Sequence, residues 1–489
     1  MNKIAACIGG GVIGGGWVAR FLLHGWDVRL FDPAPDAERK VNEVISNARR
    51  ALPALADVAM PEEGTLTLCS TLEEAVSEAQ WIQESVPERL DLKHKVMASI
   101  QAACRTDAII GSSTSGFKPS ELQEGAANPG QIMVAHPFNP VYLVPLVEVV
   151  PSQQCSPEQV ATAKDILDGI GMKPLVVRKE IDAHIADRLL EAVWREGLWL
   201  INDDVATTEE IDDAIRFGFG LRWAQMGLFE TYRIAGGEAG MAHFIGQFGP
   251  ALAWPWTKLM DVPELTDELI QKIADQSDAQ SGMYDLRQLE QIRDDNLVGI
   301  MRVQKNADWG VGAMLREHDQ RLKAMSPEQA QPEISAEPLQ MFSGKVLPAW
   351  IDYNGHMNEA NYLRVFSDAT DNFMAFVGVD DDYIQAGQSY YTVETHIRHL
   401  DDIKLGQGIE VRTQLIAQSA KKMHLFHFMY NRETGDLIAT GEHMLLHVDI
   451  NAGKTCPATD TVQAKLTAVF NSHADLPVPE GAGNAIGQK

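Results

Sequence analysis

Residues 8–14 read IGGGVIG, and this stretch decides the fold of the first part of the chain. Gly9, Gly11 and Gly14 have the spacing G-x-G-x-x-G, between an apolar run typical of a strand and an apolar pattern typical of a helix. In such a turn the first glycine permits a sharp bend, and the second lets a pyrophosphate approach the backbone. The third lets the helix pack against the strand, so the stretch predicts a dinucleotide-binding turn.

The residues around this turn indicate which dinucleotide it binds. Asp32 ends the second predicted strand, eighteen positions after Gly14. A carboxylate there accepts hydrogen bonds from both ribose hydroxyls and repels a 2′-phosphate, which favours NAD over NADP. Val12 and Ile13 open the helix, whose free N–H groups face the phosphates. The alternative is a glycine-rich turn without a ligand, and the strand, helix and acid together disfavour it.

Outward from this turn, the chain divides into sections of different pattern. In residues 1–180 short β-branched runs alternate with helical patterns, which favours an α/β Rossmann domain with a mostly parallel sheet. Residues 181–324 have apolar side chains at helical spacing and predict an all-helical domain, which we expect to serve substrate binding and dimerisation. Prolines among polar residues mark 325–340 as a linker. Residues 341–472 carry one helical pattern followed by long strands in an α+β domain, and 473–489 indicate a loose tail.

The strands expected in the first section share short runs of β-branched and apolar residues. They are Lys3–Ile8, Asp27–Phe31, Ala79–Glu84, Ala108–Gly111, Ile132–Ala135, Leu146–Val150 and Lys173–Val177.

Composition limits the classes of function. The 489 residues suffice for two or three domains, and 45% hydrophobic with 22% charged residues is typical of a globular protein. No apolar run reaches the ~18 residues of a membrane span, and no signal-peptide pattern opens the chain, so we expect a cytoplasmic protein. The five scattered cysteines predict reduced thiols, without disulfides or a metal site. A formal net charge of −27 disfavours nucleic acid as a partner.

A second group of residues suits the oxidation of a hydroxyl group. His136 directly follows a predicted strand, and Glu148 lies twelve residues later in the next apolar run. An imidazole oriented by a carboxylate is a suitable base for a hydroxyl proton. Ser115, after another predicted strand, is placed to hydrogen-bond the substrate oxygen. On spacing alone, a histidine at a strand end and a glutamate in a surface ion pair explain the same residues.

Residues 1 to about 310 resemble the 3-hydroxyacyl-CoA dehydrogenase family. The matching stretches are Ile8–Gly16, Val86–Glu88 with Lys93, Ser113–Ser115, His136–Pro140, Pro145–Val149 and Ile211–Gly218. The resemblance implies that His136 and Glu148 form the catalytic dyad and that Ser115 contacts the substrate oxygen.

The same resemblance extends to the cofactor and substrate. It implies that Glu88, Lys93 and Asn139 join the NAD site. The family usually has asparagine where Asp187 stands in this sequence, at a position that contacts substrate. This difference argues against an ordinary acyl-CoA as the substrate of the dehydrogenase.

One distinctive run lies in the second half, where Asp352–Tyr362 read DYNGHMNEANY. It resembles the D-x-x-G-H-x-N-x-x-x-Y pattern of hotdog-fold acyl-CoA thioesterases, and the resemblance covers about residues 341–470. A helix starting near Gly355 presents free N–H groups that polarise a thioester carbonyl, and Asp352 is placed to act as nucleophile or to activate water. Asn358 and Tyr362, on later turns, are placed to order that site.

The alternative is structural. A helix capped by Asp352 or Asn354, with Tyr362 in the core, gives the same local pattern. His356 fits a structural or a functional role equally well. Glu394 and His396, on a predicted strand, are weaker candidates.

The two parts together are similar to bacterial enzymes of carnitine metabolism, in which a dehydrogenase of this type is fused to a thioesterase. The resemblance implies L-carnitine and NAD at the first site, and a short acyl-CoA, betainyl-CoA, at the second. Two alternatives stay open: a 3-hydroxybutyryl-CoA or sugar-acid dehydrogenase, and a hotdog section that only pairs subunits or binds acyl-CoA. Hotdog domains complete their site with a partner, so we expect a homodimer.

The residue types themselves give weaker evidence on the substrate than the resemblance does. A trimethylammonium group binds aromatic faces, and the helical section is rich in tryptophan and phenylalanine. Tyr142 and Phe248 are candidates for such contacts. Arg195 or Arg222 would clamp a free carboxylate with paired hydrogen bonds.

Overall fold

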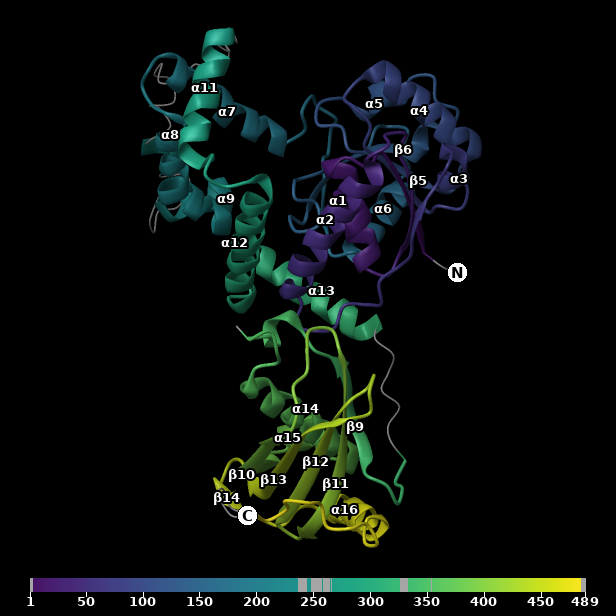
Figure 1. The fold of residues 1–489 in the computed structure, drawn as a ribbon, viewed down its shortest axis with the longest axis vertical. Helices are drawn as coiled ribbons and strands as arrows, with labels where there is room; N and C mark the ends of the chain where they lie inside the picture. The colour runs from purple at the N-terminus through teal and green to yellow at the C-terminus, as the bar shows by residue number, and fades with distance from the viewer. Residues whose placement is uncertain are drawn as a thin grey trace. The chain divides into compact units, whose positions relative to one another are not determined.

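The structure of the chain, a computed structural model, divides into two compact units (Figure 1). They are Met1–Ala56 with Met60–Met325, and Asp57–Ala59 with Ser326–Lys489. None of the described helices is both long and apolar enough to cross a membrane. The structure describes residues 3–235, 244–247, 257, 264, 266–325, 333–352 and 354–484.

The first unit is built on an eight-stranded sheet in the order β3-β2-β1-β4-β5-β6-β7-β8. Neighbouring strands run parallel except β6 and β7, so the predicted mostly parallel sheet is confirmed. The seven predicted strands are present, with ends shifted by up to two residues; the short β3 was missed because only three residues pair. The strands are β1 Ile4–Ile8, β2 Asp27–Phe31, β3 Leu66–Leu68, β4 Trp81–Glu84, β5 Ile109–Ser112, β6 Ile132–Pro137, β7 Leu146–Val150 and β8 Lys173–Val176.

Helices cover both faces of this sheet, and the alternation of strand side chains explains why. Ala5 and Cys7 of β1 join one buried cluster, whereas Ala6 and Ile8 join a second one. Successive side chains of a strand point to opposite faces, so a strand buried on both sides is apolar throughout. The first cluster contains Trp17 of the helix that follows the glycine turn.

The helical part of the first unit follows β8, as the sequence predicts. The helices and short 3-10 or π turns of the unit are α1 Val12–Leu23, α2 Ala37–Ala51, η1 Leu52–Leu55, α3 Leu72–Val76, α4 Leu90–Ala103, α5 Pro119–Leu122, η2 Pro129–Gln131, α6 Pro157–Gly169, α7 Ala186–Asn202, α8 Thr208–Ala214, η3 Ile215–Phe219, α9 Gly220–Ala235, α11 Asp267–Ser281, α12 Leu286–Asn306 and α13 Val311–Met325.

The second unit is an antiparallel sheet packed against a long central helix, consistent with the predicted hotdog fold. Its path is β10-β13-β12-β11-β9, with β14 beside β13. Phe366 of α14 packs so closely on β13 that a side chain at Gly441 would lie 2.8 Å from its ring. The elements are β9 Leu339–Lys345, η6 Pro348–Trp350, α14 Glu359–Val377, α15 Asp381–Gln385, β10 Gln388–His399, β11 Gly408–Ser419, β12 Lys422–Asn431, β13 Leu437–Asp449, β14 Lys454–Thr455 and α16 Asp460–Ser472.

Two features of this unit differ from the sequence prediction. Strand β9 precedes the helix, whereas we expected the helix first. Residues 473–484 are attached to the fold where a loose tail was predicted. His473 is buried, and its Nδ1 accepts a hydrogen bond from the backbone N–H of Leu415 (3.1 Å). The backbone N–H of Gly483 donates to the carboxylate of Glu442 (2.9 Å). Composition did not reveal these contacts because their partners lie far away in sequence.

Beneath α14, two buried histidines share one threonine. The Thr370 hydroxyl donates its single proton to the Phe366 carbonyl (2.9 Å). It therefore accepts from His427 Nε2 (3.0 Å) and from His443 Nδ1 (3.3 Å). Burial holds the pKa of His427 well below its ordinary value and lowers that of His443 to about 4. The core of this unit therefore holds the imidazoles of His427 and His443 in their neutral form.

We expect the second unit to lose stability as the pH falls below about 6.5, the ordinary histidine pKa. The unfolded chain then takes up protons that the folded core excludes, down to about pH 4 for His443. Each such histidine lowers the free energy of unfolding by up to about 1.4 kcal/mol per pH unit. Scanning calorimetry of the full chain between pH 7.5 and 5 should show one transition whose midpoint temperature falls steeply as the pH is lowered. In His443→Asn that midpoint temperature should fall less steeply. An unchanged slope in that variant, or an equal change in the exposed His399→Asn, would contradict this account.

Two candidate active sites

The glycine turn between β1 and α1 has the geometry of a phosphate site. Gly9 has a φ of +101°, and a Cβ there would lie 2.6 Å from the Ser85 carbonyl oxygen, so only glycine fits. A Cβ at Gly11 would have no neighbour within 4 Å, which leaves open space over the backbone. Val12, the first residue of α1, is exposed beside that space, and Ile13 is half-buried. The turn therefore has the room and the free N–H groups that a pyrophosphate needs.

Asp32 is fixed beside the turn. Its Oδ2 accepts a hydrogen bond from the backbone N–H of Gly10 (2.5 Å), and its Oδ1 accepts one from that of Ala34 (2.7 Å). Each carboxylate oxygen keeps a second lone pair, and the side chain is half-buried. The residues present thus fit the adenosine ribose of NAD, whose two hydroxyls need such acceptors.

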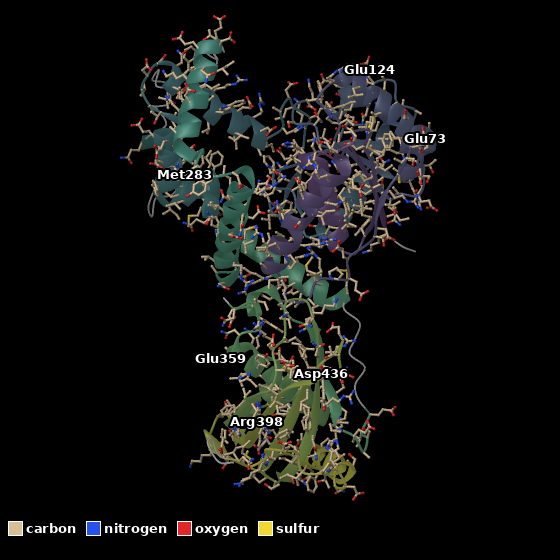
Figure 2. All side chains as sticks on the ribbon, in the orientation of Figure 1. Glu73, Glu124, Met283, Glu359, Arg398 and Asp436 are labelled. Atoms are coloured by element: carbon tan, nitrogen blue, oxygen red, sulfur yellow. The ribbon has the colours of Figure 1, made fainter. Side chains whose placement is uncertain are left out.

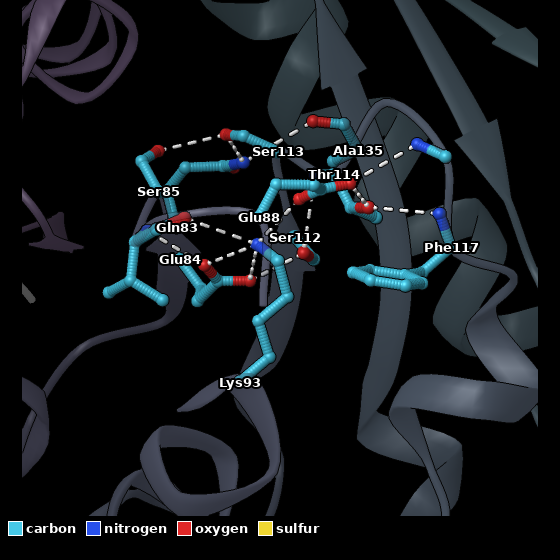
Figure 3. Close-up of polar contacts among 12 residues, drawn as sticks. Gln83, Glu84, Ser85, Glu88, Lys93, Ser112, Ser113, Thr114, Phe117 and Ala135 are labelled. Carbon is cyan, nitrogen blue, oxygen red and sulfur yellow. Dashed lines mark hydrogen bonds and ion pairs between the residues drawn. The ribbon is translucent and has the colours of Figure 1, made fainter. Parts of the chain in front are cut away.

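A buried polar network lies at the carboxyl ends of β4 and β5 (Figure 3). Lys93 is 1% exposed, and its Nζ lies 2.9 Å from Glu84 Oε1 and 3.3 Å from Glu88 Oε2. Ser112 donates to the other oxygen of Glu84 (2.5 Å), and Thr114 donates to Glu88. The ammonium group is satisfied by these acceptors, so Lys93 supports the loop that presents Glu88.

His136 is oriented by Glu148 across the antiparallel pair β6 and β7, where the two residues are register partners. His136 Nδ1 lies 3.3 Å from Glu148 Oε2, and the other carboxylate oxygen accepts the N–H groups of Ile185 (2.8 Å) and Ala186 (2.9 Å). Burial favours the neutral acid, but the hydrogen bonds from His136 and this backbone prevail and lower the pKa of Glu148. The ionised Glu148 accepts the Nδ1 proton and leaves the Nε2 lone pair of His136 free.

Three side chains surround that free nitrogen. Ser115 Oγ lies 3.3 Å from His136 Nε2, and Asp187 Oδ2 lies 3.7 Å from it. Asp187 is in the first turn of α7, and burial raises the pKa of its carboxyl, against the opposing effect of His136. The ring of His184 lies 5.7 Å from that of His136, and its Nε2 donates to the Thr114 carbonyl (3.3 Å). The structure thus brings the predicted His136, Glu148, Ser115 and Asp187 together.

The second candidate site is a tight loop before α14. Asp352 Oδ1 accepts the N–H of Asn354 (2.8 Å), and the Asp352 N–H donates to the His356 carbonyl (3.0 Å). Gly355 has a φ of +81°, a left-handed conformation that a helix excludes. The helix therefore begins at Glu359, capped by the side chain of Asn358, and the predicted start near Gly355 is wrong. The alternative cap by Asp352 or Asn354 is wrong for the same reason.

The loop carries further polar groups on one side. His356 Nε2 lies 3.1 Å from Asp402 Oδ2. The Tyr362 hydroxyl, one turn into α14, donates to the Asp401 carbonyl (3.4 Å). Burial, together with the charges of Asp402 and Asp401, raises the pKa of Tyr362 to about 12, so it stays a neutral donor. Asp352, His356, Asn358 and Tyr362 are thus held around one helix N-terminus.

Known proteins resemble this chain over its whole length. A bacterial "L-carnitine dehydrogenase/betainyl-CoA thioesterase" from Ruegeria pomeroyi is 61% identical over 99% of both chains. One from Rhizobium meliloti is 53% identical, again over 99% of both. The chain belongs to this family. Its parts match the 3-hydroxyacyl-CoA dehydrogenase NAD binding domain at residues 4–181, that enzyme's C-terminal domain at 184–278, and the thioesterase-like superfamily at 346–466.

A solved structure supports the assignment of the first unit. The NAD-dependent 5-formyl-3-hydroxy-2-methylpyridine 4-carboxylic acid 5-dehydrogenase is 29% identical, with a TM-score of 0.54. The match covers 62% of this chain and 98% of that one. The Rossmann fold, the 3-hydroxyacyl-CoA dehydrogenase domains and the thioesterase-like domain of the present chain agree with the sequence prediction.

Three further predicted site residues of this chain lie outside the group around His136 Nε2, and a fourth is not described. Tyr142 is buried and its hydroxyl donates to Asp294 of α12 (2.8 Å), so its contact with a ligand stays a prediction that this environment does not favour. Arg195 is half-buried on α7, and its Nε lies 3.7 Å from Glu191 Oε2. Asn139 is exposed in the loop after β6. Phe248 lies outside the described residues.

Sequence reasoning missed two residues of these sites. Glu84, the buried partner of Lys93, ends strand β4 just before the quoted Val86–Glu88. A charged residue at the end of an apolar strand was the available signal. His184 stands three residues before Asp187, and Ala183 and His184 both have positive φ. Nothing in the local sequence indicates that backbone conformation.

Proposed function

We propose that the chain is a bifunctional enzyme: an NAD-dependent L-carnitine 3-dehydrogenase, and a thioesterase for a short acyl-CoA such as betainyl-CoA. The observation that carries this proposal is 61% identity over nearly the full length to a relative of that name. The constellation of Glu148, His136 and Ser115 supports the first activity. The loop around Asp352 supports the second.

For the dehydrogenase, His136 is the proposed base and Ser115 the group that positions the substrate hydroxyl. Because Glu148 holds the Nδ1 proton, Nε2 of His136 is the atom that accepts the hydroxyl proton. The resulting imidazolium lies beside the carboxylate of Glu148, which stabilises its charge. Bound NAD supplies the acceptor for the hydride from the same carbon, which turns the alcohol into a ketone.

The proposed NAD site combines the turn with the network at the end of β4. The backbone at Gly9, Gly11 and Gly14, with Val12 and Ile13, would hold the pyrophosphate. Asp32 would accept the ribose hydroxyls, and Glu88 and Asn139 would line the site, with Lys93 as a support.

For the thioesterase, Asp352 is the proposed nucleophile or general base. Its carboxylate keeps three lone pairs beyond the bond from Asn354, so it has the capacity to accept a water proton. The N-terminus of α14 lies in the same loop and favours the developing negative charge on the thioester oxygen. The proposed products are the free acid and coenzyme A.

We also propose a homodimer, and a cytoplasmic location in which the five cysteines stay reduced. Strand β10 is at one end of the described sheet, and it is twelve residues long. Tyr391 and Val393 on it are 52% and 56% exposed. A long apolar edge of this kind is a site for strand pairing, and a second copy of the chain is the proposed partner.

Two assays test the proposed function. The full chain should reduce NAD, seen as absorbance of NADH, when L-carnitine is supplied, and should release free thiol from betainyl-CoA. The comparison substrates are 3-hydroxybutyryl-CoA for the first site and acetyl-CoA for the second. Faster NADH formation with 3-hydroxybutyryl-CoA than with L-carnitine would contradict the proposed dehydrogenase substrate.

We further propose that Asp187 selects a cationic substrate. The reacting hydroxyl must lie at His136 Nε2, and Asp187 Oδ2 is 3.7 Å from that atom. In L-carnitine the trimethylammonium nitrogen is two bonds from the hydroxyl-bearing carbon, so a bound substrate can bring it to about 6 Å from the carboxylate. At that separation an ion pair near a protein surface is worth about 2–3 kcal/mol. The asparagine usual in the acyl-CoA enzymes would not provide it.

We expect Asp187→Asn to lower kcat/KM for L-carnitine by roughly 10–100-fold, because the charge is lost while the shape is kept. For 3-hydroxy-5,5-dimethylhexanoate, in which carbon replaces the charged nitrogen, kcat/KM should change little. Steady-state NADH production with both compounds gives the comparison. Glu191→Gln, one turn along the same helix, is the matched control and should have a small effect. Equal losses on both compounds would show that Asp187 acts through His136 and not on the substrate charge.

A further inference from the structure

A cavity of about 450 Å³ lies in the helical part of the first unit, between α9 and the turn joining α12 to α13. This volume is within the range of small-molecule sites, roughly 300–1,000 Å³. Trp223 and Glu230 of α9 line one side, and Trp309 of the turn lines another. The proposed reactions use none of these residues.

The cavity is held open by the backbone. Gly227 interrupts α9 with a φ of +71°, and Gly310 in the turn has a φ of +56°. Two hydrogen bonds tie the elements together across the gap: Trp309 Nε1 donates to the Gln225 carbonyl (2.8 Å) and Gln304 Nε2 to the Ala224 carbonyl (2.9 Å). These bonds orient the Trp309 indole at the cavity wall.

The lining has the chemistry of a site for an organic cation. Trp223 and Trp309 are 36% and 46% exposed, so both rings are accessible from solvent. Glu230 is exposed, and no hydrogen bond or ion pair to its carboxylate is found within the described part of the chain. The described lining residues include neither lysine nor arginine. Aromatic faces and a carboxylate attract methylated ammonium groups, whose charge is diffuse and weakly hydrated.

We propose that this cavity binds a quaternary ammonium cation, with Trp223 and Trp309 as aromatic walls and Glu230 as the counter-charge. The proposal goes beyond the proposed function, because a cation binds here whatever the chain oxidises. The net charge of −27 favours the approach of such a ligand. The proposed function places the substrate's ammonium group at Asp187, so the ligand expected here is a separate trimethylammonium compound; the substrate itself is the alternative if Asp187 does not hold that group.

Calorimetric titration of the full chain tests the site without turnover. The probes are choline and its neutral isostere 3,3-dimethylbutan-1-ol, which differ only in the charged nitrogen. We expect choline to bind at least about 10-fold more tightly than the isostere, and Glu230→Gln to weaken choline by about 10-fold. Trp309→Leu should weaken both probes. Glu124→Gln, an exposed position of the first unit (Figure 2), is the matched control and should leave binding unchanged.

The outcomes separate the possibilities. Absence of saturable choline binding overturns the proposal, as does choline binding that is unchanged in both Glu230→Gln and Trp309→Leu. If choline binds as expected, its effect on NADH production identifies the source. Inhibition competitive with L-carnitine assigns the cavity to the substrate's own ammonium group, whereas inhibition or activation that alters kcat alone assigns it to a separate compound. A chain that binds choline but does not oxidise L-carnitine refutes the proposed function and leaves this site standing.

Discussion

His136→Gln should lower kcat for NAD-dependent oxidation of L-carnitine by roughly 10³-fold, within the range typical of lost general-base catalysis. Glutamine keeps an N–H group that can donate to Glu148, but it has no lone pair of suitable basicity where Nε2 stood. NADH production measures the loss. Release of thiol from betainyl-CoA should be unchanged, because His136 and Asp352 belong to separate compact units.

The control for this variant is His94→Gln. The His94 side chain is half-buried in the same unit and donates only to the Glu121 carbonyl (2.7 Å). It should oxidise L-carnitine at nearly the wild-type rate. If His136→Gln keeps more than about a tenth of kcat, another group takes the proton and the assignment of the base is wrong.

Asp352→Asn should lower kcat for betainyl-CoA hydrolysis by roughly 10³-fold, with dehydrogenase activity unchanged. The amide oxygen of asparagine can still accept the N–H of Asn354, so the loop should keep its shape. What is lost is the carboxylate that attacks the thioester or takes the proton of water. A thiol-specific dye that detects coenzyme A release measures the rate.

Asp436→Asn is the matched control, because Asp436 is exposed on the same unit (Figure 2) and lies in the turn between β12 and β13, outside the Asp352–His356 loop. It should hydrolyse betainyl-CoA like the wild type. If instead neither Asp352→Asn nor the wild-type chain releases thiol from any short acyl-CoA, the second unit is a binding or pairing module.

Much of the catalytic chemistry was readable in the sequence because it depends on local backbone. The glycine spacing required a turn in which Gly9 takes a positive φ, and the structure has that turn. Strand alternation and length predicted seven of the eight strands of the first sheet. The family resemblance implied that His136 and Glu148 form a pair, and their register across β6 and β7 places them side by side.

The sequence misplaced features that depend on where the backbone turns. Gly355 was expected to start a helix, but the chain folds back there, with Ile351 bridging to Met357, so that α14 starts at Glu359. Tyr142 was expected near the substrate because it follows the His136 loop closely. In the fold, its hydroxyl meets Asp294, 152 positions away, and the ring is buried.

By itself, the sequence predicted the classes of domain, the preference for NAD and the residues of both candidate sites, because each follows from a local pattern or from a family motif. Only the tertiary structure decided the partners that tune those residues. The bonds from Ile185 and Ala186 that keep Glu148 ionised, and the approach of Asp187 to His136, join segments some 40 to 50 positions apart. Strand order and helix packing create such contacts, and no local pattern records them.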